Sequence, residues 1–81
     1  MKHRVVWAKS VWELLSELPE RESGEIVEKL DLLVYFPQMC PLRVKGRFRR
    51  HRFFRAGNWL VYYKFVDETI YIRGLWPARI P

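Results

Sequence analysis

The fold is decided by residues 47–76, which read RFRRHRFFRAGNWLVYYKFVDETIYIRGLW. Three runs in this stretch are rich in aromatic and β-branched side chains and follow a period of two, which is typical of β-strands. They are residues 48–55, 59–66 and 69–76. The breaks between them, 56–58 and 67–68, are short enough for hairpins. The stretch therefore predicts a three-stranded antiparallel meander.

The first residues of the chain predict a strand followed by a helix. Residues 3–8 are β-branched and aromatic, which favours a strand. Ser10 and Glu13 have the spacing of a capping box, in which two side chains take backbone N–H groups of the first helical turn. Apolar residues then recur with helical spacing, and Pro19 ends the helix. They are Val11, Leu14, Leu15 and Leu18.

A second helix is predicted before Pro37. It begins between Glu20 and Glu25, since Gly24 weakens any helix that runs through it. A tight connection makes the two helices an antiparallel hairpin. The fold class is therefore α+β in a single domain over residues 1–81. The helices pack on one face of the meander, and the N-terminal strand is added at a sheet edge.

Loop length predicts the register of the second hairpin. A two-residue turn at 67–68 pairs Phe65 with Ile70 and Tyr62 with Arg73. The strand residues then separate into an apolar face for the helices and an open face.

The first hairpin is predicted to have a three-residue loop at 56–58. This loop places Arg52 beside Tyr62 and Arg50 beside Lys64, whereas a two-residue Ala-Gly turn would drive both arginines into the core. The open face is then basic and aromatic. It displays Arg50, Arg52, Lys64 and Arg73 among Tyr62, Tyr71 and Phe54.

Length and cysteine content exclude several classes of protein. A chain of 81 residues is too short for a multidomain enzyme. Cys40 is the single cysteine, so it can close no intrachain disulfide, and with only His3 and His51 it can form no zinc site. The sequence has neither a run of about 18 apolar residues nor a signal peptide. We therefore expect a cytoplasmic protein.

The net charge of +6 is concentrated in the second half of the chain. Residues 1–40 carry a net charge of −2 and residues 41–81 a net charge of +8. Seven bases and no acid lie between Arg43 and Arg55. Such a run attracts polyanions, and aromatic rings among the bases favour single-stranded RNA. An acidic protein segment would fit the same face equally well.

The order of elements and the string Arg55-Ala56-Gly57-Asn58-Trp59-Leu60-Val61-Tyr62-Tyr63 resemble the RelE/ParE superfamily of bacterial and archaeal toxins. The similar family pattern is a basic strand, then Gly, an optional Asp or Asn, an aromatic residue, Arg, two apolar residues and Tyr. The Leu18-Pro19 and Phe36-Pro37 steps resemble the family as well, so the resemblance covers nearly the whole chain.

The resemblance implies the toxin of a type II toxin–antitoxin system. RelE-like members are mRNA interferases, endoribonucleases that cut mRNA in the ribosomal A site and thereby inhibit translation. The resemblance further implies no metal, no cofactor and no catalytic carboxylate. The implied partners are a cognate antitoxin, the ribosome with its mRNA, and operator DNA only through the antitoxin complex, with no membrane.

The resemblance also implies site residues. Arg50, Arg52 and Arg79 match basic positions of the family's catalytic cluster, and Arg73 could replace a phosphate-binding arginine that is missing here at Trp59 or Leu60. The general acid is unassigned, because arginine is a poor proton donor, and the C-terminal Tyr of some members has no counterpart. His51 is an alternative acid or base, although the favoured register points it to the opposite face beside Tyr63. The basic run and the open face supply the RNA-binding candidates. They are Arg47, Arg49, Arg55, Tyr62, Lys64 and Tyr71.

Two other functions fit the same resemblance. A ParE-like toxin would inhibit DNA gyrase by binding and cut nothing, which the missing catalytic groups favour. A catalytically decayed chain would keep only the capacity to bind its antitoxin. The density of arginines on the basic strand favours the RelE-like reading.

Overall fold

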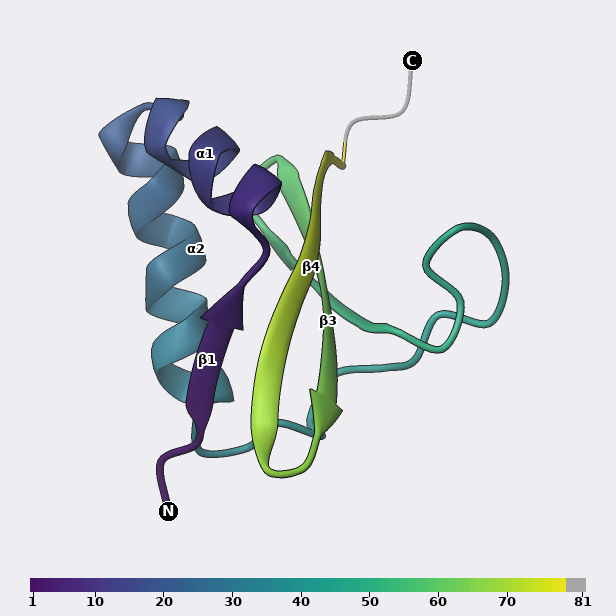
Figure 1. Ribbon diagram of the computed structural model, residues 1–81. Helices are drawn as coiled ribbons and strands as arrows, with labels where there is room; N and C mark the ends of the chain where they lie inside the picture. Colours follow the sequence, from purple (N-terminus) through teal and green to yellow (C-terminus); the bar gives the residue numbers. More distant parts are fainter. Residues whose placement is uncertain (79–81) are drawn as a thin grey trace.

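The helices and the sheet form two layers, with both helices on one face of the sheet (Figure 1). The computed structural model describes residues 1–78. Its elements are β1 (Arg4–Trp7), α1 (Lys9–Glu17), α2 (Glu20–Leu33), β2 (Arg52–Ala56), β3 (Trp59–Val66) and β4 (Thr69–Pro77). The predicted α+β class is confirmed. Within this range no helix combines the length and apolar character needed to cross a membrane.

The strands of the described chain form one sheet in the order β1-β4-β3-β2. β2, β3 and β4 make the antiparallel meander that the sequence predicts. β1 lies at the sheet edge, also as predicted, and it runs parallel to β4. A parallel pair needs a long crossover connection, which the intervening helices and strands provide. The sheet is therefore mixed rather than purely antiparallel.

α1 begins earlier than the predicted capping box. Ala8 is the N-cap, no side chain caps the helix, and Ser10 lies inside the first turn. The capping box is wrong because the sheet fixes the start: the Ala8 N–H donates to the Ile72 carbonyl at 3.0 Å, and the helix follows at once. The chain leaves helical geometry at Leu18, because a residue before proline disfavours the α region.

The core lies between the two layers. It contains Val11 and Leu15 of α1, Ile26, Leu30 and Leu33 of α2, and Val61, Tyr63, Ile70 and Ile72 of the sheet. Tyr63 is the largest fully buried side chain, and its hydroxyl donates to the Pro37 carbonyl at 2.8 Å. Burial raises the pKa of Tyr63 above its ordinary value, because ionisation would leave a poorly solvated phenolate. This bond ties the loop after α2 to the centre of the sheet.

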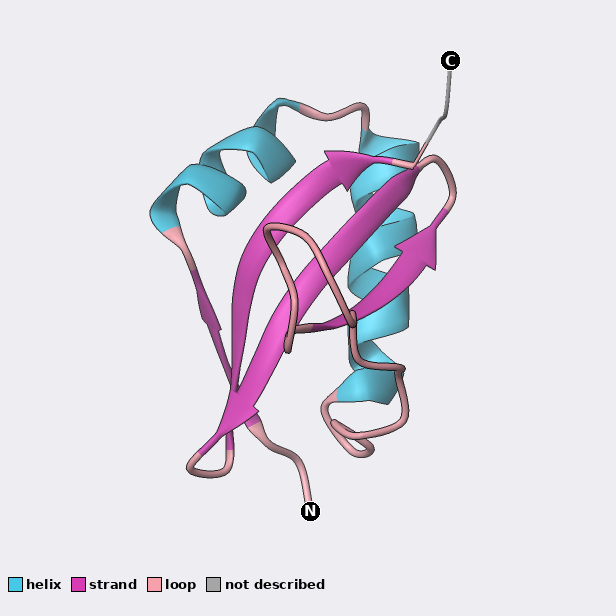
Figure 2. Ribbon diagram, turned by 90° about the vertical axis from the view of Figure 1, so that its right-hand side faces the viewer, coloured by secondary structure: helices cyan, strands magenta, loops and turns pink. Residues whose placement is uncertain are grey.

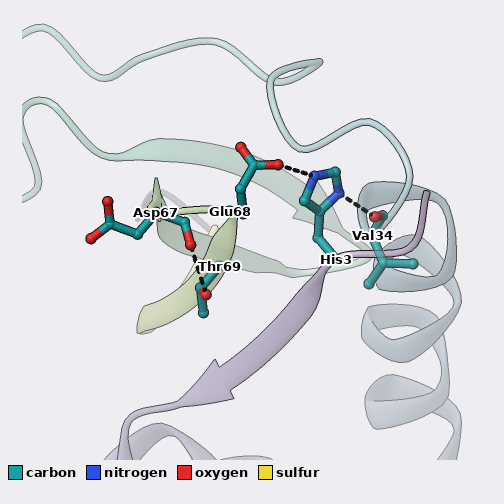
Figure 3. Close-up of polar contacts among 5 residues, drawn as sticks. All are labelled: His3, Val34, Asp67, Glu68 and Thr69. Atoms are coloured by element: carbon teal, nitrogen blue, oxygen red, sulfur yellow. Dashed lines mark hydrogen bonds and ion pairs between the residues drawn. The ribbon is translucent and has the colours of Figure 1, made fainter.

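His3 connects the start of β1 to two other parts of the chain (Figure 3). Its Nδ1 lies 3.0 Å from the Val34 carbonyl oxygen, and its Nε2 lies 3.2 Å from Glu68 Oε1. The imidazole also packs edge-on against Phe65, with 5.1 Å between ring centroids. The N-terminal strand is thereby fastened to the end of α2 and to the β3–β4 turn.

The β3–β4 turn is the two-residue turn predicted at 67–68. Both turn residues have positive φ, as in a type I′ turn. The strand pairs nearest the turn are as predicted. A β-bulge between Tyr62 and Tyr63 then shifts the register, so Tyr62 pairs with Gly74 rather than with Arg73. That part of the predicted register is wrong by one residue.

The β2–β3 turn consists of residues 57–58, so the predicted three-residue loop is wrong. Arg52 pairs with Tyr63 and lies on the helix side of the sheet rather than on the open face. The predicted loop length was chosen on the assumption that an arginine on the helix side would have no hydrogen-bond acceptors. Arg52 instead stands at the first residue of β2, where its Nη1 donates to the Cys40 carbonyl at 2.7 Å. The same shift buries Phe54 in the core, where it is 4% exposed.

Residues 43–50, which we call the strap, cross the sheet face opposite the helices (Figure 2). The strand predicted for residues 48–55 is wrong in its first half, because β2 begins only at Arg52. The strap closes on itself: the Arg43 N–H donates to the His51 carbonyl at 2.8 Å. The predicted open face is therefore partly covered.

Candidate functional site

Phe48 anchors the strap to the sheet. Its ring is stacked on the Tyr62 ring, with centroids 4.3 Å apart and planes 9° from parallel. Edge-on contacts with His51 and Trp76 surround it, at 5.4 and 6.3 Å between centroids. The ring rests on Gly74, which pairs with Tyr62 next to the bulge. Tyr62 is consequently only 5% exposed.

The aromatic pocket is a hollow of about 400 Å³ beside this anchor. Its lining consists of Arg43, Arg47, Phe48, Leu60, Tyr62, Trp76, Pro77 and Ala78. The Arg47 guanidinium carbon lies 5.6 Å from the Phe48 centroid and 5.5 Å from that of Trp76. Arg43 sits 5.8 Å from the Tyr62 centroid. The pocket thus combines ring faces with guanidinium planes and has the size of a small-ligand site.

The basic pocket, of about 230 Å³, lies where β3 extends beyond the start of β2. Its lining consists of Gln38, Leu42, Arg50, Arg52, Lys64, Phe65 and Val66. Arg52 is fixed there by its bonds to the carbonyls of Cys40 and Gln38, at 2.7 and 3.3 Å. Arg50 is exposed, and Lys64 is half-buried. Three cations therefore converge on one concave site.

The bases around the two pockets have no acidic partners in the part of the chain that the structure describes. The one ion pair within residues 1–78 joins His3 to Glu68. None of the seven bases between Arg43 and Arg55 lies within ion-pair distance of a carboxylate there. Unpaired cations raise the local positive potential and favour binding of an anion. Phosphate groups suit the basic pocket, and planar bases suit the aromatic pocket.

The structure resembles two solved proteins over nearly its whole length. One is a chain of the archaeal RelE–RelB complex from Pyrococcus horikoshii, with a TM-score of 0.75 and 27% identity, covering 96% of this chain and 97% of that one. The chain therefore has the fold of the RelE-like toxin superfamily. A mutant of the E. coli toxin RelE in the free state has a TM-score of 0.74 at 12% identity, covering 96% and 85%. No family profile and no curated protein matches the sequence.

The RelE-like fold brings together five of the ten residues proposed from the sequence. Arg47 and Tyr62 line the aromatic pocket. Arg50, Arg52 and Lys64 line the basic pocket. Arg50 and Lys64 meet there although Arg50 lies in the strap and is not paired with β3.

The other five residues are not gathered in this way. Arg49, Arg55, Tyr71 and Arg73 line neither pocket. The Arg55 Nε instead donates to the Gly57 carbonyl at 2.8 Å, within its own hairpin. Arg79 lies outside the described residues.

Four members of the site were not identified from the sequence: Arg43, Phe48, Trp76 and Gly74. Phe48 was assigned to a strand because basic and aromatic residues alternate through the strap as they would in a strand. The backbone breaks that run at Arg50, whose φ of 69° is uncommon for a residue other than glycine, so the sequence carried no signal of the break. Gly74 did carry a signal, since a glycine inside a strand often marks a bulge or a close approach, but nothing local indicates that the approaching group is Phe48.

Proposed function

We propose that this chain is the toxin of a type II toxin–antitoxin pair and acts as an mRNA endonuclease on the ribosome. Its proposed partners are a cognate antitoxin, mRNA in the ribosomal A site, and operator DNA only through the antitoxin complex. Its proposed location is the cytoplasm. The similarity to a chain of a RelE–RelB complex supports an antitoxin partner.

The observation that carries this proposal is the pair of pockets on either side of the strap. Strap residues line both pockets, Phe48 and Arg47 in the aromatic one and Arg50 in the basic one. A single strand of RNA presents the matching alternation, with planar bases and anionic phosphates along one chain. One bound strand would therefore satisfy both pockets at once.

The proposed reaction is attack of a ribose 2′-oxygen on the adjacent phosphorus. The 2′-hydroxyl gives its proton to water, the new P–O bond gives a 2′,3′-cyclic phosphate, and the broken bond releases the 5′-oxygen, which takes a proton from water to become a hydroxyl. Negative charge grows on the phosphorane oxygens, and preorganised cations are most effective against charge that develops in the transition state. Arg50, Arg52 and Lys64 would supply that stabilisation without a metal or cofactor.

The test is cleavage of mRNA on programmed ribosomes, read by primer extension. Wild-type protein is expected to cut within the A-site codon, and Lys64→Ala to cut roughly 100-fold more slowly. Lys9→Ala, on the helix side, is the matched control and should cut like wild type. Intact mRNA with folded wild-type protein would contradict the nuclease proposal.

A gyrase-inhibiting, ParE-like function is the second candidate. The observation in its favour is that Leu60, one of the two positions where the family arginine is expected, lines the aromatic pocket as an apolar residue. Induction in bacteria separates the two functions. DNA-damage signalling with intact transcripts supports the gyrase target, cut transcripts support the nuclease, and normal growth supports an antitoxin-binding module without toxicity.

A further inference from the structure

The face of Tyr62 that would take a stacked base is already occupied by Phe48. The two rings are nearly parallel, 9° apart, at a centroid separation of 4.3 Å. That arrangement is the one an aromatic side chain makes with a nucleobase in single-strand binding proteins. With Tyr62 only 5% exposed, no second ring fits on this face while Phe48 is in place.

Gly74 provides the space for the Phe48 ring. A Cβ built at Gly74 would lie 2.5 Å from Phe48 Cζ, well inside van der Waals contact. The backbone at Gly74 is not in the left-handed region that favours glycine, so any residue could adopt its conformation. A side chain at this position would instead occupy the space that the Phe48 ring fills. The β-bulge brings Gly74 opposite Tyr62 and so places this space directly beside the stacking face.

The strap is held more to itself than to the sheet. Its backbone bonds join Arg43 to Arg50, Arg43 to His51 and Arg49 to Gly46, all within the loop and its base. Contact with the sheet is made by side chains, chiefly the Phe48 ring. The other contacts come from two guanidinium groups: Arg43 donates to the Tyr62 hydroxyl at 3.4 Å and lies over its ring, and Arg47 lies over Trp76. Removal of the Phe48 ring from its seat therefore leaves these guanidinium contacts as the ties between strap and sheet.

The charge of the strap identifies what would displace the ring. Five of its eight residues are cationic: Arg43, Lys45, Arg47, Arg49 and Arg50. None of them is within ion-pair distance of a carboxylate in residues 1–78, so their mutual repulsion opposes the closed position. A polyanion relieves that repulsion, and only one that also carries planar rings can take the place of Phe48.

We propose that Phe48 is an internal placeholder for an RNA base. Single-stranded RNA displaces the Phe48 ring from Tyr62, one base stacks in its place, and the cationic strap then lies along the phosphates. This inference rests on the proposed RNA-binding function. It makes the closed strap an autoinhibitory state whose population sets the apparent affinity for RNA.

The first test uses NMR on the full chain with a short 2′-O-methyl single-stranded RNA, which cannot be cleaved. In the free protein, nuclear Overhauser contacts are expected from the Phe48 ring to the Tyr62 ring and to Gly74 Hα, and RNA is expected to abolish them. RNA binding that leaves these contacts in place overturns the proposal for Phe48 but is compatible with the proposed RNA binding. Loss of the contacts with an acidic peptide that bears an aromatic residue, but not with RNA, also overturns it.

The second test measures affinity for the same RNA in three variants. Phe48→Ala deletes the ring and Phe48→Leu replaces it with an apolar side chain that cannot stack, so both are expected to bind roughly tenfold more tightly than wild type. Val44→Ala is the matched control, because Val44 is in the strap but 86% exposed. Thermal unfolding identifies folded variants, and Phe48→Leu decides the question if Phe48→Ala is unfolded.

Each outcome of the affinity test is decisive. Weaker or unchanged binding by the folded variants shows that Phe48 is part of the RNA-binding surface or irrelevant to it, and overturns the proposal. Absence of binding by wild type together with tight binding by Phe48→Ala or Phe48→Leu supports it. Absence of binding by every folded chain is instead the failure of the proposed function.

Discussion

Two side chains, Tyr63 and Arg52, fix the loop that separates α2 from the strap. Tyr63 donates to the Pro37 carbonyl from inside the core, and Arg52 donates to the Cys40 carbonyl from the end of β2. Both bonds join loop backbone to the sheet, so the base of the strap is a fixed point. Arg52 therefore keeps its place in the basic pocket even when the ring of Phe48 leaves its seat.

Tyr63→Phe is expected to lower the free energy of unfolding by about 1–3 kcal/mol at neutral pH, because the Pro37 carbonyl loses its buried donor. The effect should shrink at alkaline pH. The raised pKa keeps folded Tyr63 protonated above about pH 10, where an unfolded tyrosine ionises. The unfolded state then binds fewer protons, and wild-type stability falls by up to about 1.4 kcal/mol per pH unit.

Urea unfolding of both proteins between pH 7 and pH 11 checks this prediction. The phenylalanine variant lacks this ionisation, so the gap between the two proteins should narrow as pH rises. A gap that stays constant would show that the hydroxyl has the same pKa in both states.

Arg50 and Arg52 are expected to respond differently to truncation although both line the basic pocket. Arg52→Ala leaves two loop carbonyls without their charged donor and should cost about 1.5–3 kcal/mol of stability. Arg50→Ala removes an exposed side chain and should change stability by less than about 0.5 kcal/mol. Both should slow mRNA cleavage roughly 100-fold. Urea melts and single-turnover cleavage on ribosomes measure the two effects separately, and equal stability losses would contradict this division.

Among the elements, the β3–β4 hairpin was predictable and β2 was not. Both strands of the hairpin are rich in aromatic and β-branched residues up to a two-residue break, so their register near the turn follows from sequence. The bulge between Tyr62 and Tyr63 shifts the register farther from the turn, and Gly74 is its one local signal. The run before Arg52 alternates basic and other residues, yet it forms the strap, because the backbone turns at Gly46 and at Arg50.

In the candidate site, too, some features could be predicted from the sequence and others could not. The basic run identified Arg47, Arg50 and Arg52 from sequence because charge density does not depend on register, and Lys64 was identified from the predicted open face. Which of these share a pocket depends on the loop and the bulge, and therefore on contacts between residues distant in sequence. The sequence did not indicate the aromatic pocket for that reason, because Phe48 and Trp76 come into contact only once the strap is folded.

β1 is a short element whose attachment depends on His3. His3→Ala removes contacts with the Val34 carbonyl, Glu68 and Phe65 and should cost about 1–2 kcal/mol of stability. Glu68→Gln is the matched control, because the Glu68 side chain is 81% exposed and a surface pair contributes less than about 1 kcal/mol. Hydrogen exchange of the β1 amides should accelerate in the first variant and hardly in the second. Equal acceleration would show that the ion pair, rather than the buried contacts, holds the strand.

The whole molecule separates its charge between layers. The segment containing both helices, residues 1–40, carries −2, whereas residues 41–81, with the meander and the strap, carry +8. The separation orients the molecule in the field of a polyanion, with the strap face leading. It also predicts that the affinity for RNA falls as the salt concentration rises.

The logarithm of the RNA association constant should fall linearly with the logarithm of salt concentration. Between three and five of the cations that line the pockets can reach phosphates, which gives a slope of roughly −2 to −3.5 for a single strand. Arg47→Ala should reduce the magnitude of the slope by about 0.7, the share of one phosphate contact. Lys9→Ala removes the same charge from α1, on the helix layer, and should leave the slope unchanged. If both variants reduce it equally, net charge alone attracts the RNA, and the strap face has no special part in binding it.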